Sequence, residues 1–182
     1  MNQPANQDDS VITYQFALDD GKNFSFSVDR SREWSKELDA GEHAAWTKLD
    51  FHQCENCPLS TEEYQHCPVA VDLEPMVASF SEIVSIERLQ VEVQTASRTY
   101  RRECDAQSGV LALMGLIMST SGCPRLNPLR VLAEMHLPFA TLDETVFRVC
   151  GAYLIHEYLQ MSDGEAPDWE MTKLKQYFEE LQ

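Results

Sequence analysis

The sequence has little positive charge. Its 182 residues include 14 Lys and Arg against 30 Asp and Glu, which gives a net charge of −16. Such a surface repels phosphate backbones and anionic lipid headgroups, so we expect neither nucleic acid nor a membrane as a partner. The best candidate for a basic patch is Arg98, Arg101 and Arg102, which we interpret instead as charge that protects the exposed edge of a strand.

Long hydrophobic runs are also absent. The longest apolar run, residues 110–118, is too short to cross a bilayer and is typical of a buried helix. The first ten residues, MNQPANQDDS, have no basic start, apolar run or small-residue cleavage site, so no secretory signal is expected. We therefore expect a cytoplasmic protein.

Several common catalytic and nucleotide-binding motifs are missing. The chain has no GxGxxG or GxxxxGK[ST] loop for phosphates and no GxSxG turn for a serine nucleophile. The sequence makes no positive case for nucleotide binding or serine catalysis, and it leaves open whether the protein is an enzyme.

Cysteine is the residue type that stands out. The segment FHQCENCPLSTEEYQHCPVA, residues 51–70, contains three of the six cysteines and two histidines. In a cytoplasm that keeps thiols reduced, clustered cysteines indicate a metal site or catalysis before a structural disulfide. The segment therefore predicts a metal or redox site.

The proposed ligands are Cys54, Cys57, Cys67 and Cys123. Two cysteines separated by two residues form a tight turn that lets both sulfurs reach one ion. The last three of these cysteines are each followed by proline, which stiffens the chain after the ligand. If Cys123 lies too far away, His52 or His66 could complete the coordination.

Two metals and one metal-free chemistry fit this pattern. Zinc prefers tetrahedral thiolate sites and is our first choice, while an iron–sulfur cluster also uses four cysteines. The rival without metal is a reactive dithiol formed by Cys54 and Cys57. A closed four-ligand zinc site leaves no position for water or substrate, which argues against metal-centred hydrolysis.

The predicted fold class is α+β. Residues 11–18 and 24–28 flank an Asp-Gly turn, and residues 86–93 and 98–104 flank a second turn, so we expect two β-hairpins in one antiparallel sheet. One domain is expected over residues 1–182. It would comprise a disordered tail (1–9), a sheet-rich half with the cysteine loop (10–104) and a helical half (105–182).

Several helices are expected from their end signals and apolar spacing. Pro68 suits the first turn of a helix, residues 106–119 and 127–136 form two more, and Thr141 with Glu144 has the spacing of a capping box. The helix after Thr141 would present Val146, Phe147, Cys150, Tyr153, Leu154 and Leu159 on its apolar side. Asp168 would cap a final helix.

Four segments carry a resemblance to a known family. CENCPL, HCPVAVDL, LMGLIMSTSGCP and HLPFATLDETVFR together resemble an uncharacterised bacterial domain family, and the likeness covers most of the chain. The resemblance implies that the CxxCP, CP and SGCP cysteines belong together, which favours Cys123 over a histidine as the fourth ligand. It implies no activity. The resulting hypothesis is a cytoplasmic zinc-binding module that binds another protein or regulates it.

Overall fold

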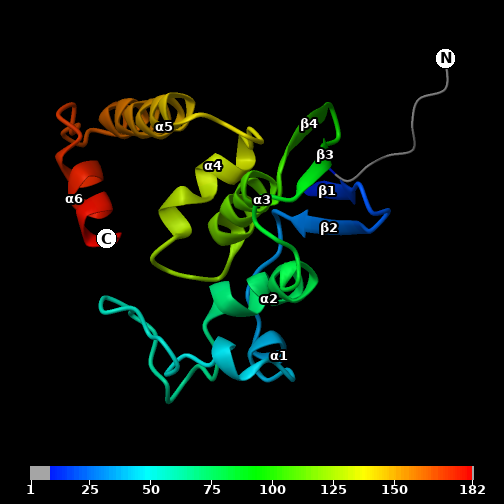
Figure 1. The fold of residues 1–182 in the computed structure, drawn as a ribbon. Helices are drawn as coiled ribbons and strands as arrows, with labels where there is room; N and C mark the ends of the chain where they lie inside the picture. The colour runs from blue at the N-terminus through cyan, green and yellow to red at the C-terminus, as the bar shows by residue number, and fades with distance from the viewer. Residues whose placement is uncertain (1–8, 182) are drawn as a thin grey trace.

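Four strands form one antiparallel sheet in the computed structural model, which describes residues 9–181 (Figure 1). The order across the sheet is β2-β1-β3-β4, so the two predicted hairpins are joined through β1 and β3. Residues 1–8 of the expected tail lie outside the described part. The strands are β1 (Val11–Leu18), β2 (Asn23–Asp29), β3 (Arg88–Gln94) and β4 (Thr99–Asp105).

The turn between β1 and β2 has the predicted chemistry. Gly21 has a φ of +89°, a left-handed conformation that glycine adopts without a steric penalty. The carboxylate of Asp20 accepts a hydrogen bond from the backbone N–H of Lys22 at 2.9 Å, which supports the same turn. The Asp-Gly signal therefore located the first hairpin correctly.

One face of the sheet forms the core. Alternate residues of β1 and β3 are buried beneath α3 (Ala106–Thr120), among them Tyr14, Phe16 and Val91. A Cβ at Gly109 of α3 would lie 3.1 Å from the Phe16 ring and 3.0 Å from Val91, so this glycine lets the helix lie close to the sheet. The carboxylate of Asp105 caps α3 by accepting the N–H of Ser108 at 2.8 Å.

The helices predicted after residue 67 are present with two differences, and two short helices between residues 36 and 47 were not predicted. The first is that residues 127–136 form two short pieces, because η2 ends at Leu129 and α4 ends at Glu134. Pro128 lies in the first turn of η2, where its missing N–H is tolerated. These helices are α1 (Lys36–Asp39), η1 (Ala45–Thr47), α2 (Pro68–Phe80), η2 (Asn127–Leu129), α4 (Arg130–Glu134), α5 (Leu142–Ser162) and α6 (Thr172–Leu181).

The second difference concerns α5. Its predicted capping box is present, since Thr141 and Glu144 exchange the expected hydrogen bonds. The expectation that Phe147 and Leu159 face the core is wrong, because they are 79% and 56% exposed. The reason is position: α5 lies beside α4 and α6, away from the sheet (Figure 1), and contributes one buried residue, Glu157.

Asp168 has a role close to the one predicted. Its carboxylate accepts the N–H of Lys173 at 2.8 Å at the start of α6, and it also accepts the hydroxyl of Tyr153 at 2.9 Å. Asp168 thus ties the last helix to α5. Among the residues that the structure describes, no helix is both long enough and apolar enough to pass through a membrane.

Candidate metal centre

The cysteine loop is closed at its base by backbone hydrogen bonds. Lys48 and His66 form an antiparallel bridge, the N–H of Leu49 donates to the carbonyl of Gln65 at 3.0 Å, and the N–H of Cys67 donates to the carbonyl of Thr47 at 2.8 Å. Residues 48–66 therefore leave and re-enter the fold at one place. Figure 1 shows this loop extending from η1 and α2.

A buried polar network anchors the base of the loop. The carboxylate of Asp39 accepts the N–H groups of Gln65 and His66, each at 2.9 Å. The hydroxyl of Thr47 lies 2.7 Å from Nδ1 of His66, and both side chains are buried. His66 thus serves in this network, and its Nδ1 is already engaged.

A second histidine extends the network. Nδ1 of His43 lies 2.9 Å from a carboxylate oxygen of Glu74 in α2, and its ring stands 5.0 Å from the ring of His66. A hydrogen bond to the carbonyl of Leu38 raises the pKa of His43, and Glu74 raises it further. The contact between His43 and Glu74 joins the segment after α1 to α2.

Cys54 and Cys57 form the expected turn. The N–H of Cys57 donates to the carbonyl of Cys54 at 3.0 Å, which places both cysteines on one tight turn. Asn56, between them, donates from its side-chain amide to the carbonyl of Glu180 in α6 at 3.4 Å. The turn at Cys54 therefore reaches the last helix of the chain.

Cys67 is the residue that immediately precedes α2. Burial raises the pKa of its thiol, while the N–H groups of Ala70 and Val69 in the first turn of α2 lower it. The negative charges of Cys123 and Cys54 raise the same pKa further.

Cys123 lies in the turn that follows α3. Its carbonyl accepts the N–H groups of Leu126 and Asn127, each at 3.1 Å. A Cβ on the preceding Gly122 would lie 2.3 Å from Cβ of Trp34, so only glycine fits between this turn and the segment after β2. The turn is therefore held against the N-terminal half of the chain.

The Cys123 turn and the Cys54 turn meet at the end of α6. Arg125 donates to the carbonyl of Glu180 at 2.9 Å and pairs with its carboxylate at 3.1 Å. The same carbonyl accepts the amide of Asn56. Tyr177 adds a hydrogen bond from its hydroxyl to the carbonyl of Arg125 at 2.7 Å. Segments about 70 residues apart thus share one acceptor.

A comparison with family models covers nearly the whole chain. A model described as "Domain of unknown function (DUF6901)" matches residues 12–182. The chain belongs to this family. The match spans Cys54, Cys57, Cys67 and Cys123, and it confirms the expected resemblance to a family without an assigned activity. No curated protein and no solved structure matches the chain.

The four proposed cysteines do not form a ligand set among the described residues. Within residues 9–181, no three His, Cys, Asp or Glu side chains are placed so that they could hold a metal ion. Of the alternative ligands, His66 is buried in its own network, and His52 is exposed with its ring 4.8 Å from that of Phe51. The zinc site stays a prediction, and it requires the thiols to turn toward a common centre.

The other two cysteines lie elsewhere. Cys104, near the end of β4, is buried and belongs to the core. Cys150 is half-buried on α5. The residues that sequence reasoning missed are Trp34, Asn56, Arg125 and Glu180. No local signal marks them, since each acts through a contact with a remote segment.

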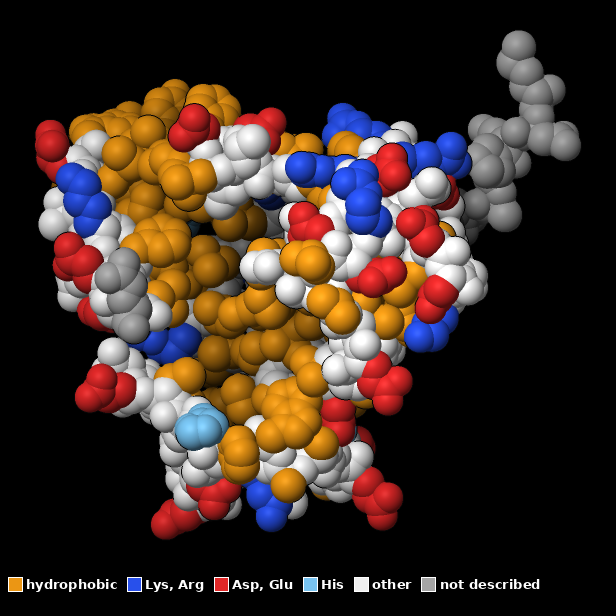
Figure 2. All heavy atoms as spheres, viewed as in Figure 1, with side chains coloured by type: hydrophobic (Ala, Val, Ile, Leu, Met, Phe, Trp, Pro, Cys, Tyr) orange, Lys and Arg blue, Asp and Glu red, His pale blue; other side chains and the backbone are white. Residues whose placement is uncertain are grey.

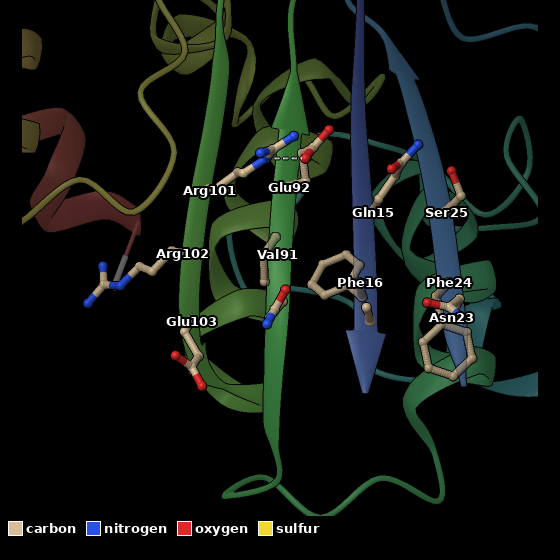
Figure 3. A pocket seen from close by; sticks show the side chains of 12 residues that line it. Gln15, Phe16, Asn23, Phe24, Ser25, Val91, Glu92, Arg101, Arg102 and Glu103 are labelled. Atoms are coloured by element: carbon tan, nitrogen blue, oxygen red, sulfur yellow. Dashed lines mark hydrogen bonds and ion pairs between the residues drawn. The ribbon is translucent and has the colours of Figure 1, made fainter. Parts of the chain in front are cut away.

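A cavity across the strands of the sheet contains no cysteine or histidine among its described lining residues. The cavity has a volume of about 630 Å³. In it Arg101 points toward Glu92 and forms an ion pair with it (Figure 3). Arg102 extends instead over the ring of Phe139, 5.4 Å from its centre. β4 is an edge strand, which agrees with the interpretation of its arginines as edge protection.

Proposed function

We propose that this chain is a metal-binding module in which Cys54, Cys57, Cys67 and Cys123 hold a structural zinc ion. The ion would tie the loop after β2 to the turn after α3 and so join the two halves of the chain. We further propose that the module acts in the reducing cytoplasm by binding another protein or regulating it.

One observation carries this proposal. Asn56, between Cys54 and Cys57, and Arg125, two residues after Cys123, both donate to the backbone carbonyl of Glu180. A single acceptor brings the two turns to one place, independently of any metal. A shared ion would then require the cysteine side chains to rotate so that their sulfurs face one centre.

The electrostatics of Cys67 support a cation at this position. Burial is the largest cause that raises the pKa of its thiol, and ionisation of Cys123 or Cys54 would raise that pKa further. A divalent cation reverses that relation, because a coordinated thiol loses its proton and the ion neutralises the thiolates. The start of α2 adds N–H groups that favour the thiolate.

The same geometry disfavours a reactive dithiol. A low-pKa dithiol gains much of its reactivity from the N-terminus of a helix. Here α2 begins at Pro68 and follows Cys67, whereas Cys54 and Cys57 lie in an irregular loop. Because burial and nearby cysteines raise the pKa of Cys67, that thiol is not an activated nucleophile either.

The direct test is elemental analysis and visible absorption of protein purified without oxygen. We expect about one zinc per chain and no colour, whereas an iron–sulfur cluster would absorb in the visible. Cys54→Ser and Cys123→Ser should each lower the zinc content and the melting temperature together, because binding energy at such a site is also folding energy.

Cys150→Ser provides a matched control, because Cys150 lies on α5 outside the cluster and should keep the metal. Loss of zinc from Cys54→Ser but not from Cys123→Ser would remove Cys123 from the site. Protein that contains no metal and whose melting temperature does not change when zinc or a chelator is added would refute the proposal.

A further inference from the structure

Helix α5 exposes apolar side chains that the rest of the chain leaves uncovered. Phe147, Ile155 and Tyr158 are 79%, 63% and 57% exposed, and Figure 2 shows hydrophobic atoms over most of the visible surface around α5. Isolated exposed apolar residues are normal, but a contiguous patch marks an interaction site. None of the proposed zinc ligands lies on α5, so the zinc ion does not explain this patch.

Three of the exposed apolar residues of α5 lie on one stripe, together with Gly151 and Leu154, which are half-buried. Phe147, Gly151, Leu154, Tyr158 and Met161 follow one another at intervals of four, three, four and three residues. This spacing places them on one side of the helix and is the pattern by which two helices pack along a shared seam. We call these five residues the α5 stripe.

Contacts within the chain use other sides of α5. Arg148 donates to the carbonyls of Leu132 and Met135 at 2.7 and 2.6 Å, which fixes the helix against α4. Val149 and Ala152 line a cavity of about 450 Å³ between α4, α5 and α6. The inward side of α5 is thus accounted for, and the stripe lies away from it.

Gly151 gives the stripe a feature that the monomer does not explain. Glycine inside a helix is less favourable than alanine by about 1 kcal/mol. A Cβ at Gly151 would meet nothing within 4 Å, so no contact within the chain requires its absence. A second helix approaching closely at this point would require it.

We propose that α5 is the interface of a homodimer, in which the stripes of two copies pack antiparallel. In this register Leu154 of each copy lies over Gly151 of the other, and Phe147 of each lies against Tyr158 of the other. Large residues meet small ones at the centre, and aromatic rings meet at both ends. The stripe is therefore complementary to itself.

Charge and area agree with a second copy as the occupant. Between Glu144 and Asp163 the only acid is Glu157, which is buried and accepts the N–H of Asp168 at 2.6 Å, so two acidic chains can meet here without opposing carboxylates. A large side chain offers about 150–250 Å² when fully exposed. The stripe with Ile155 then supplies roughly 600 Å² per copy, and two copies reach the lower range of stable interfaces, about 1,200 Å².

Sedimentation equilibrium of the full chain tests the proposal. We expect a concentration-dependent dimer that persists in chelator, which separates it from the proposed zinc site. Gly151→Leu should weaken association at least 100-fold without lowering the melting temperature measured at concentrations where neither protein associates, because the added side chain enters open space in the monomer. The matched control is Gly115→Leu on α3, another helix-interior glycine with open space at its Cβ, which should leave association unchanged.

A charge exchange tests the orientation. Phe147→Glu and Tyr158→Lys should each be monomeric alone, and an equimolar mixture should form heterodimers, because the antiparallel register brings the two new charges together. A mixture that stays monomeric would overturn this register. A wild-type chain that is monomeric at all concentrations, or a dimer that survives Gly151→Leu, would overturn the interface itself.

Discussion

Helices α3 and α5 have similar apolar content and opposite surroundings. Seven of the fifteen residues of α3 are buried, whereas α5 buries one of twenty-one. α3 follows β4 directly and covers the sheet, while α5 follows the short α4 and packs beside it. An apolar face therefore shows that a helix needs a partner, and the order of elements along the chain decides whether that partner lies within the same molecule.

The comparison predicts its largest effect for leucine truncation. Leu113→Ala on α3 removes a side chain with 0% exposure and should reduce the free energy of unfolding by about 2–5 kcal/mol. Leu159→Ala on α5, outside the stripe, should change it by no more than about 0.5 kcal/mol. Urea unfolding of both variants measures the difference, and equal losses would show that α5 packs as tightly as α3.

The junction between the sheet and the outer helices should respond to pH. Nε2 of His136, just after α4, lies 2.6 Å from the hydroxyl of Tyr14 in β1. Burial, together with the smaller effect of the charges of Arg148 and Arg30, lowers the pKa of His136 to about 4. An unfolded histidine has a pKa near 6.5, so between these values the unfolded chain binds more protons than the folded one.

Stability from this group is therefore complete above about pH 6.5 and is lost as the pH falls toward 4, by about 3 kcal/mol in total. His136→Gln keeps a hydrogen-bonding side chain but cannot titrate, so its unfolding free energy should fall less steeply over this range. Urea midpoints measured at several pH values give both slopes. Parallel slopes for the two proteins would mean that His136 titrates equally in the folded and unfolded chains.

The smallest effect is expected at the start of α5. Thr141→Ala removes the side chain that accepts the N–H of Glu144 at 3.2 Å and should cost about 1 kcal/mol. Thr145→Ala, one turn later, removes a hydroxyl that bonds only to the carbonyl of Thr141 and should be nearly neutral. Thermal unfolding distinguishes the two variants, and a neutral Thr141→Ala would show that α5 forms without its cap.

Local signals predicted most of the fold. The Asp-Gly turn, the alternation in β1 and β3, Pro68 at the start of α2 and the capping box of Thr141 each depend on neighbours within a few residues. Such signals are reliable because the same short segment creates and satisfies them. They failed for residues 127–136, where local turn geometry split the expected helix, and for the side of α5 that faces solvent.

The candidate site also combines features that the sequence predicts with features that it does not. The four cysteines and their prolines are visible in the sequence, and the tight turn at Cys54 and Cys57 follows from their spacing. The role of Glu180 is not visible, because a backbone carbonyl carries no sequence signal. The sequence also does not show that Trp34 leaves no room for a side chain at Gly122, because the two residues lie about 90 positions apart.

The sequence by itself determined the α+β class, the two hairpins, the helix caps and the set of cysteines, because short-range hydrogen bonding and side-chain periodicity specify these features. Only the tertiary structure decided which segments meet at the end of α6 and which apolar faces stay uncovered. Those outcomes depend on how whole elements pack around one core, and packing is a property of the assembled layers rather than of any single segment.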